Sequence, residues 1–191
     1  MIVVHPYDSS TRFLSLIYED IPGVKFFDSF LQKDAIISSI KAAPGDEPIL
    51  LLGHGSLYGL CDFRTVGPVI GDTEAGILRD RPNLCGIWCH ASVFAHFHDL
   101  KGFFSGMFVS EYAEALDEGV QAEPGKIEDM NWDFAGRFGE LLREGLSMEE
   151  IARRLSAPAL MTSDLTEYNY RRLTYRKTGL EPLPERDWLR K

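Results

Sequence analysis

Two apolar runs decide the fold of this chain: PILLLGHGS at residues 48–56 and LCGIWCHA at residues 84–91. A continuous apolar run bounded by turn-forming residues is typical of a central strand in a parallel sheet, because both faces of such a strand are covered. Each run also delivers a reactive side chain, His54 in the first and Cys89 in the second. Ligands bind beyond the carboxyl ends of parallel strands, so we expect both side chains at one crevice.

Predicted strands and helices alternate along the chain, which favours the α/β class and a three-layer α/β/α sandwich with a mostly parallel central sheet. The chain is most simply one domain, 1–191, with the sheet core at about 1–120 and a mainly helical part at 121–191. Glycine-rich residues 55–71 predict a hairpin or excursion over the carboxyl edge of the sheet. Further strands are expected at residues 2–5, 24–28 and 102–110, and helices at residues 11–19, 32–43, 73–80, 92–99, 111–118, 128–143 and 147–155.

Composition excludes several classes of protein. A net charge of -9 and a pI near 5.0 argue against a nucleic-acid partner, since a phosphate backbone attracts clustered Lys and Arg. No apolar run approaches the roughly 20 residues of a membrane helix, so no membrane partner is expected. The start, MIVVH, has neither the basic region nor the apolar length of a signal peptide. Three cysteines without a CxxC pair indicate reduced thiols, and therefore a cytoplasmic protein.

Cys89 is the first candidate nucleophile, because its strand ends at the expected crevice. His54 is placed to take the thiol proton and later to protonate a leaving amine. The N–H of Gly55, together with that of Cys89, is a candidate donor to an oxyanion. Cys85 shares the strand but sits deeper and is expected in the core, and Cys61 lies in a loop. The alternative is that Cys89 is a structural thiol beside a hydrogen-bonded histidine.

An apolar run ending in His54-Gly55, followed by an apolar run ending in a cysteine about 30 to 50 residues later, resembles the caspase-like (clan CD) cysteine peptidases. Cys89-His90-Ala91 looks like metacaspases, and GMFVSE at residues 106–111 looks like the bacterial gingipain and clostripain type. The resemblance covers roughly the first 115 residues. It implies a His54–Cys89 dyad, a sheet in the order 2-1-3-4-5, a peptide or protein substrate, and no cofactor. Ile87 departs from the family, because an acidic residue often stands there.

The resemblance also implies a specificity pocket. In several members that cleave after Arg or Lys, an acidic residue after the first strand lines this pocket, and Asp8 stands in the matching region. We therefore expect a preference for Arg or Lys before the scissile bond, with Asp8 as the main counter-ion and Glu111 as a second. Ser110 and His90 are the other expected substrate-binding residues. Capping of the following helix is an equally open role for Asp8.

A zinc site is an alternative use of the same side chains, since thiolate and imidazole both suit zinc. His96 and His98 diverge on the predicted helix, so they argue against it. The candidate zinc ligands are His54, Cys89, His90, His96 and His98. Because they are not expected to gather, no metal site is predicted.

Two further alternatives concern the class of protein. A serine hydrolase would need Gly-x-Ser-x-Gly around Ser56, but Tyr58 occupies the place of the last glycine. A caspase-like fold without catalysis, serving as a binding or regulatory module, stays open because fold does not fix function. The presence of both His54 and Cys89 favours the enzyme. The oligomeric state is not predicted by any of these patterns.

Overall fold

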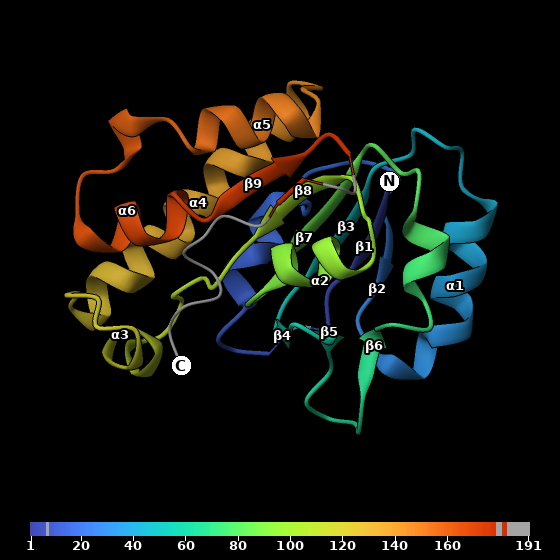
Figure 1. Ribbon diagram of the computed structural model, residues 1–191, viewed down its shortest axis with the longest axis horizontal. Helices are drawn as coiled ribbons and strands as arrows, with labels where there is room; N and C mark the ends of the chain where they lie inside the picture. Colours follow the sequence, from blue (N-terminus) through green and yellow to red (C-terminus); the bar gives the residue numbers. More distant parts are fainter. Residues whose placement is uncertain (7, 179–180, 183–191) are drawn as a thin grey trace.

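A six-stranded sheet forms the centre of the computed structural model, which describes residues 1–6, 8–178 and 181–182 (Figure 1). The strand order is β2-β1-β3-β7-β8-β9. Strands β2, β1, β3, β7 and β8 are parallel, and counted along the chain within this sheet they follow the expected order 2-1-3-4-5. Strand β9 runs antiparallel to β8 at the edge. The strands are β1 (Ile2–Val4), β2 (Lys25–Phe27), β3 (Ile49–Leu52), β7 (Leu84–Ile87), β8 (Gly102–Ser105) and β9 (Leu173–Arg176).

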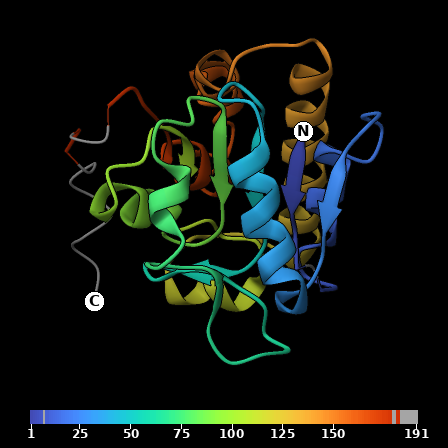
Figure 2. The ribbon, with the colours of Figure 1, turned by 90° about the vertical axis from the view of Figure 1, so that its right-hand side faces the viewer.

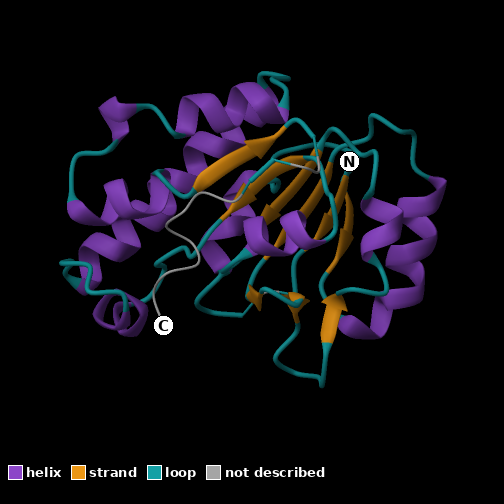
Figure 3. Ribbon diagram, in the orientation of Figure 1, coloured by secondary structure: helices purple, strands orange, loops and turns teal. Residues whose placement is uncertain are grey.

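Helices cover both faces of this sheet (Figure 3). Together with the mostly parallel strands, they confirm the predicted α/β class. The α-helices are α1 (Lys33–Ala42), α2 (Ala91–Phe97), α3 (Tyr112–Asp117), α4 (Pro124–Arg143), α5 (Met148–Leu155) and α6 (Asp164–Tyr170). The 3-10 helices are η1 (Arg12–Ile17), η2 (Phe30–Gln32), η3 (Ala75–Leu78) and η4 (Pro158–Leu160).

Side chains alternate between two cores along each strand, as the period of two requires. One core packs the sheet against η1, α4 and α5, and the other packs it against α1, η3 and α2. This division is what makes three layers. The strand side chains of the first core include Val3, Leu50, Leu52, Cys85, Ile87 and Phe103, and those of the second include Ile2, Val4, Ile49, Leu51, Leu84 and Phe104.

Several element predictions were wrong in type or length. The segments expected as helices at residues 11–19 and 73–80 are the short 3-10 helices η1 and η3, and no side-chain cap opens either of them. The strand expected at residues 102–110 ends at Ser105. The amide of Gly106 still donates to the carbonyl of Arg172 at 2.8 Å in the register of β8 and β9, but the amide of Arg172 donates to the carbonyl of Asn169 instead of completing a further pair. α4 begins at Pro124 rather than at residue 128, with proline in its favoured place at a helix start.

A second, three-stranded antiparallel sheet confirms the excursion predicted for residues 55–71. It consists of β4 (Gly55–Ser56), β5 (Gly59–Cys61) and β6 (Pro68–Ile70). Figures 1 and 2 show this small sheet beyond the carboxyl ends of the parallel strands. It therefore forms one wall of the edge at which His54 and Cys89 emerge. Among the described residues, no helix combines the length and apolar character needed to span a membrane.

Candidate active site

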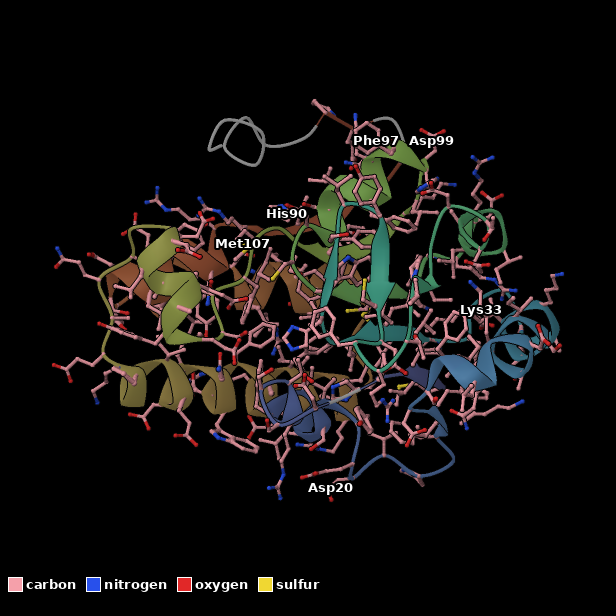
Figure 4. All side chains as sticks on the ribbon, turned by 90° about the horizontal axis from the view of Figure 1, so that it is seen from below. Asp20, Lys33, His90, Phe97, Asp99 and Met107 are labelled. Carbon is pink, nitrogen blue, oxygen red and sulfur yellow. The ribbon has the colours of Figure 1, made fainter. Side chains whose placement is uncertain are left out.

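His54 and Cys89 stand at equivalent places on neighbouring strands. β3 and β7 are paired so that Leu52 is opposite Ile87, and each reactive residue follows its strand's member of that pair by two positions. Both residues line a small cavity of about 20 Å³ at the carboxyl edge, the side of the molecule seen in Figure 4. The structure thus brings the two predicted side chains to one cavity, as expected for ends of adjacent parallel strands.

His54 is held by the segment that precedes η1. Its Nε2 lies 2.7 Å from Oγ of Ser10 and 3.2 Å from Oδ2 of Asp8. The hydroxyl of Ser10 donates its one proton to Oδ1 of Asp8 at 2.7 Å, so it accepts from an Nε2–H of His54. The ring of His54 also lies 4.8 Å, between centroids, from that of Phe63. These contacts fix the imidazole and leave Nδ1 as the nitrogen that no hydrogen bond within the described chain engages.

Cys89 makes contacts with a different part of the chain. Its thiol lies 3.7 Å from the carbonyl oxygen of Phe108 and 3.8 Å from Oε1 of Glu114. Burial, followed by the charge of Glu114, raises the pKa of the Cys89 thiol to about 12. Throughout the described residues, no hydrogen bond joins Cys89 to His54. Cys89 and His54 thus share one cavity, and burial and Glu114 both favour the neutral thiol at Cys89.

The strand end before Cys89 is rigidly fixed. The backbone N–H of Trp88 donates to Oγ of Ser105 at 3.1 Å, and that hydroxyl donates back to the carbonyl of Trp88 at 2.8 Å. The indole N–H of Trp88 donates to the carbonyl of Ser56 at 3.0 Å, which ties β7 to the small sheet. Gly55, the predicted oxyanion donor, lies in β4 so close to the indole that a Cβ there would be 2.2 Å from its Cδ1. Glycine is thus the residue that fits at position 55.

Glu114 is a site residue that the sequence analysis missed. Its Oε2 accepts from the amide of Ser110 at 2.7 Å, from the hydroxyl of Ser110 at 3.1 Å and from the amide of Glu111 at 3.0 Å. This is half of a capping box at the start of α3, in which Glu111 completes the pair. The spacing Glu111-x-x-Glu114 could have indicated the cap, but nothing local indicates the approach of Glu114 to Cys89.

A larger cavity of about 380 Å³ adjoins the dyad cavity. Phe13 and Ser110 line both cavities, so the two are neighbours. Predicted substrate-binding residues Ser110 and Glu111 lie on its wall. Its lining comes from the start of η1, the start of α3 and the first turns of α4: Ser9, Ser10, Arg12, Phe13, Ser110, Glu111, Tyr112, Pro124, Ile127, Glu128, Asn131 and Trp132.

Asn131 gives this cavity an unusual polar group. It is 5% exposed, and its side-chain N–H donates to the carbonyl of Ser110 at 2.9 Å. Its side-chain oxygen is buried without a hydrogen-bond partner among the described residues. A buried acceptor without a partner costs free energy, about 1–3 kcal/mol.

Neither Asp8 nor His90 lines the cavity that would serve as the predicted specificity pocket. Asp8 does not line the cavity; its carboxylate accepts from the amides of Ser10 and Thr11 at 2.9 and 3.2 Å and faces His54. Those bonds close the turn before η1, but they are not the predicted helix cap, because the N-cap of η1 is Thr11 and no side chain caps it. His90 has a φ of 69°, donates its amide to the carbonyl of Gly106 and begins α2. Figure 4 shows it beside Met107, outside both cavities.

The remaining predicted side chains separate in the structure. Cys85 is fully buried in the core, as expected, and Cys61 lies partly exposed on β5. His96 approaches the carbonyl of Glu181, whereas His98 pairs with Asp72. Within the described ranges, no three His, Cys, Asp or Glu side chains gather as a metal ion would require.

Comparison with known proteins yields no match: neither a protein-family model, nor a curated protein, nor a solved structure matches the chain. The function is therefore argued from the geometry of the site.

Proposed function

We propose that this protein is a cysteine peptidase of the caspase-like type that uses Cys89 as its nucleophile and His54 as its general acid and base. The observation that carries this proposal is the placement of both side chains two residues beyond one register pair, on the same small cavity. Three free cysteines are consistent with a reducing, cytoplasmic setting. No cofactor takes part in the proposed reaction.

The chemistry is acyl transfer through a thioester. The Cys89 sulfur attacks the carbonyl carbon while its proton passes to His54. His54 then gives that proton to the amine as the C–N bond breaks. Water next attacks the thioester, His54 takes its proton, and the Cys89 sulfur leaves. The N–H groups of Gly55 and Cys89 are the proposed donors to the oxyanion.

Asp8 and Ser10 act on His54 in this proposal. The carboxylate of Asp8 lies 3.2 Å from Nε2 and favours the protonated imidazole that forms during the reaction. The hydroxyl of Ser10 fixes the ring by its 2.7 Å contact, so Nδ1 is the nitrogen proposed to exchange protons with Cys89. Orientation of a histidine by a third group is a general requirement of such sites.

The proposed substrate is a peptide or protein with Arg or Lys before the scissile bond, and no nucleic acid is proposed as a partner. The 380 Å³ cavity beside the dyad is large enough for a long side chain. Glu111 and Glu128 provide two carboxylates on its wall, against the single cation of Arg12.

A panel of fluorogenic peptides that differ before the scissile bond tests this proposal. We expect cleavage after Arg or Lys, no cleavage by Cys89→Ala, and a loss of about 100-fold or more in His54→Ala. Cys61→Ala is the matched control and should retain full activity. A preference for Asp would contradict the acidic pocket. Absence of cleavage by the wild type would favour the alternative, a non-catalytic binding module, which the neutral state of Cys89 also supports.

A further inference from the structure

The two oxygens of the Glu114 carboxylate contact different parts of the chain. Oε2 holds the amides of Ser110 and Glu111 at 2.7 and 3.0 Å, and Oε1 lies 3.8 Å from the Cys89 sulfur. A carboxylate beside a thiol opposes formation of the thiolate, since the two negative charges repel. The backbone of one segment and the state of the nucleophile are thus joined through a single side chain.

The same segment forms a wall of the 380 Å³ cavity. Ser110, Glu111 and Tyr112 all line it, and the first two are the residues that Glu114 holds. A side chain that enters the cavity therefore lies beside the segment that Glu114 holds.

α3 is short and partly open to solvent, although Asn131 on α4 holds its start and Tyr168 on α6 donates to Glu118 at its end. Asn169 on α6 bonds both the amide and the carbonyl of Val109, at 2.8 and 2.9 Å. Beyond that point α3 is short, and Leu116 on its outer side is 63% exposed. A groove of about 990 Å³, lined by α3, α4 and α6, includes Ala115 and Leu116. The exposed side of α3 therefore borders an open groove.

We propose that Glu114 is a latch: in the unliganded protein its charge adds to burial in keeping Cys89 as a neutral thiol, and a substrate side chain entering the 380 Å³ cavity moves the start of α3 and withdraws the carboxylate. The proposal rests on the cysteine-peptidase function proposed above. When the latch opens, the S–H bond of Cys89 breaks and the proton binds Nδ1 of His54, which gives a thiolate and an imidazolium. No other reactant is needed.

The other ionisable groups near the thiol do not take the place of Glu114. His54 lies across the small cavity and His90 follows in the chain. Asp8 faces His54 rather than the sulfur, and Glu111 lies at the start of α3. Glu114 is the carboxylate that contacts the sulfur directly.

Labelling of Cys89 with iodoacetamide, followed by mass spectrometry of the Cys89 peptide, tests the latch without needing turnover. The Glu114→Gln variant removes the charge but keeps an oxygen for the two amides, and at pH 8 we expect labelling at least about ten-fold faster than in the wild type. Asp117→Asn, on the exposed side of the same helix, is the matched control and should label at the wild-type rate. Equal rates in all three proteins would overturn the proposal.

The pH profile of labelling in the wild type tests the first requirement of the latch, a neutral Cys89 thiol, even if the variant does not fold. We expect its midpoint well above that of an ordinary thiol, and a midpoint at or below 9 would refute the latch. The two proposals also fail separately. Faster labelling of Glu114→Gln without cleavage of any peptide would support the latch and reject the peptidase. Cleavage of a peptide by the wild type, with labelling of Glu114→Gln unchanged, would support the peptidase and reject the latch.

Discussion

His5 allows a prediction about pH whose size follows from the structure. It follows the first strand and is 0% exposed, and its ring nitrogens lie 2.9 Å from the hydroxyl of Tyr18 and 3.4 Å from that of Thr11. Burial lowers its pKa from 6.5 to about 4, although the charge of Asp8 acts in the opposite direction. The side chain supports the segment that carries Ser10 to His54, so its charge state bears on the site.

The sign of the effect follows from proton binding. The unfolded chain binds a proton at His5 below pH 6.5, but the folded protein does so only below about pH 4. The free energy of unfolding therefore falls as pH falls through this window and is unaffected by His5 outside it. The full loss is about 3 kcal/mol, and about 2 kcal/mol of it occurs between pH 7 and pH 4.5.

Urea unfolding of the wild type and of His5→Gln at pH 7 and pH 4.5 measures this contribution. Glutamine keeps hydrogen-bonding capacity but cannot titrate, so the variant should lose about 2 kcal/mol less than the wild type over this interval. Carboxylates contribute equally to both proteins and cancel in the comparison. An identical pH dependence in the two proteins would refute the assignment of a buried, neutral His5.

Two further predictions concern residues that position the site. Gly55→Ala places a Cβ 2.2 Å from the Trp88 ring and should lower the free energy of unfolding by about 2 kcal/mol, as measured by urea titration. Gly76→Ala, which meets nothing within 4 Å, is its control, and equal losses would count against the packing argument. Asn169→Ala leaves the amide and carbonyl of Val109 unpaired and should cost about 3 kcal/mol in the same assay; a change below about 0.5 kcal/mol would contradict it.

The central strands and the two reactive residues could be predicted because their signals are local. β3 and β7 are fully buried on both faces, so their sequences are continuously apolar. Because parallel strands end at a common edge, the residues that follow them were expected together. In contrast, β9 is an edge strand with a mixed burial pattern, and its sequence has no period that indicates a strand.

The partners of the reactive residues could not be predicted, because they depend on how distant segments return to the edge. Ser10 lies 44 residues before His54, and its contact depends on the path taken by the turn before η1. Glu114 reaches Cys89 only because the chain leaves the sheet at Ser105 and turns back. Local bonds hold Asp8 in the turn before η1 and Glu114 in the capping box of α3, whereas their contacts with His54 and Cys89 are long-range.

The proposed peptidase function requires that Cys89 is the nucleophile that becomes acylated. The most direct measurement is mass spectrometry of the protein quenched with acid during turnover of an Arg or Lys peptide ester. We predict a thioester adduct on the peptide that contains Cys89, a marked decrease of this adduct in His54→Ala, and none in Cys89→Ala. Turnover of the ester with no adduct on Cys89, or with an adduct that persists in Cys89→Ala, would contradict the account.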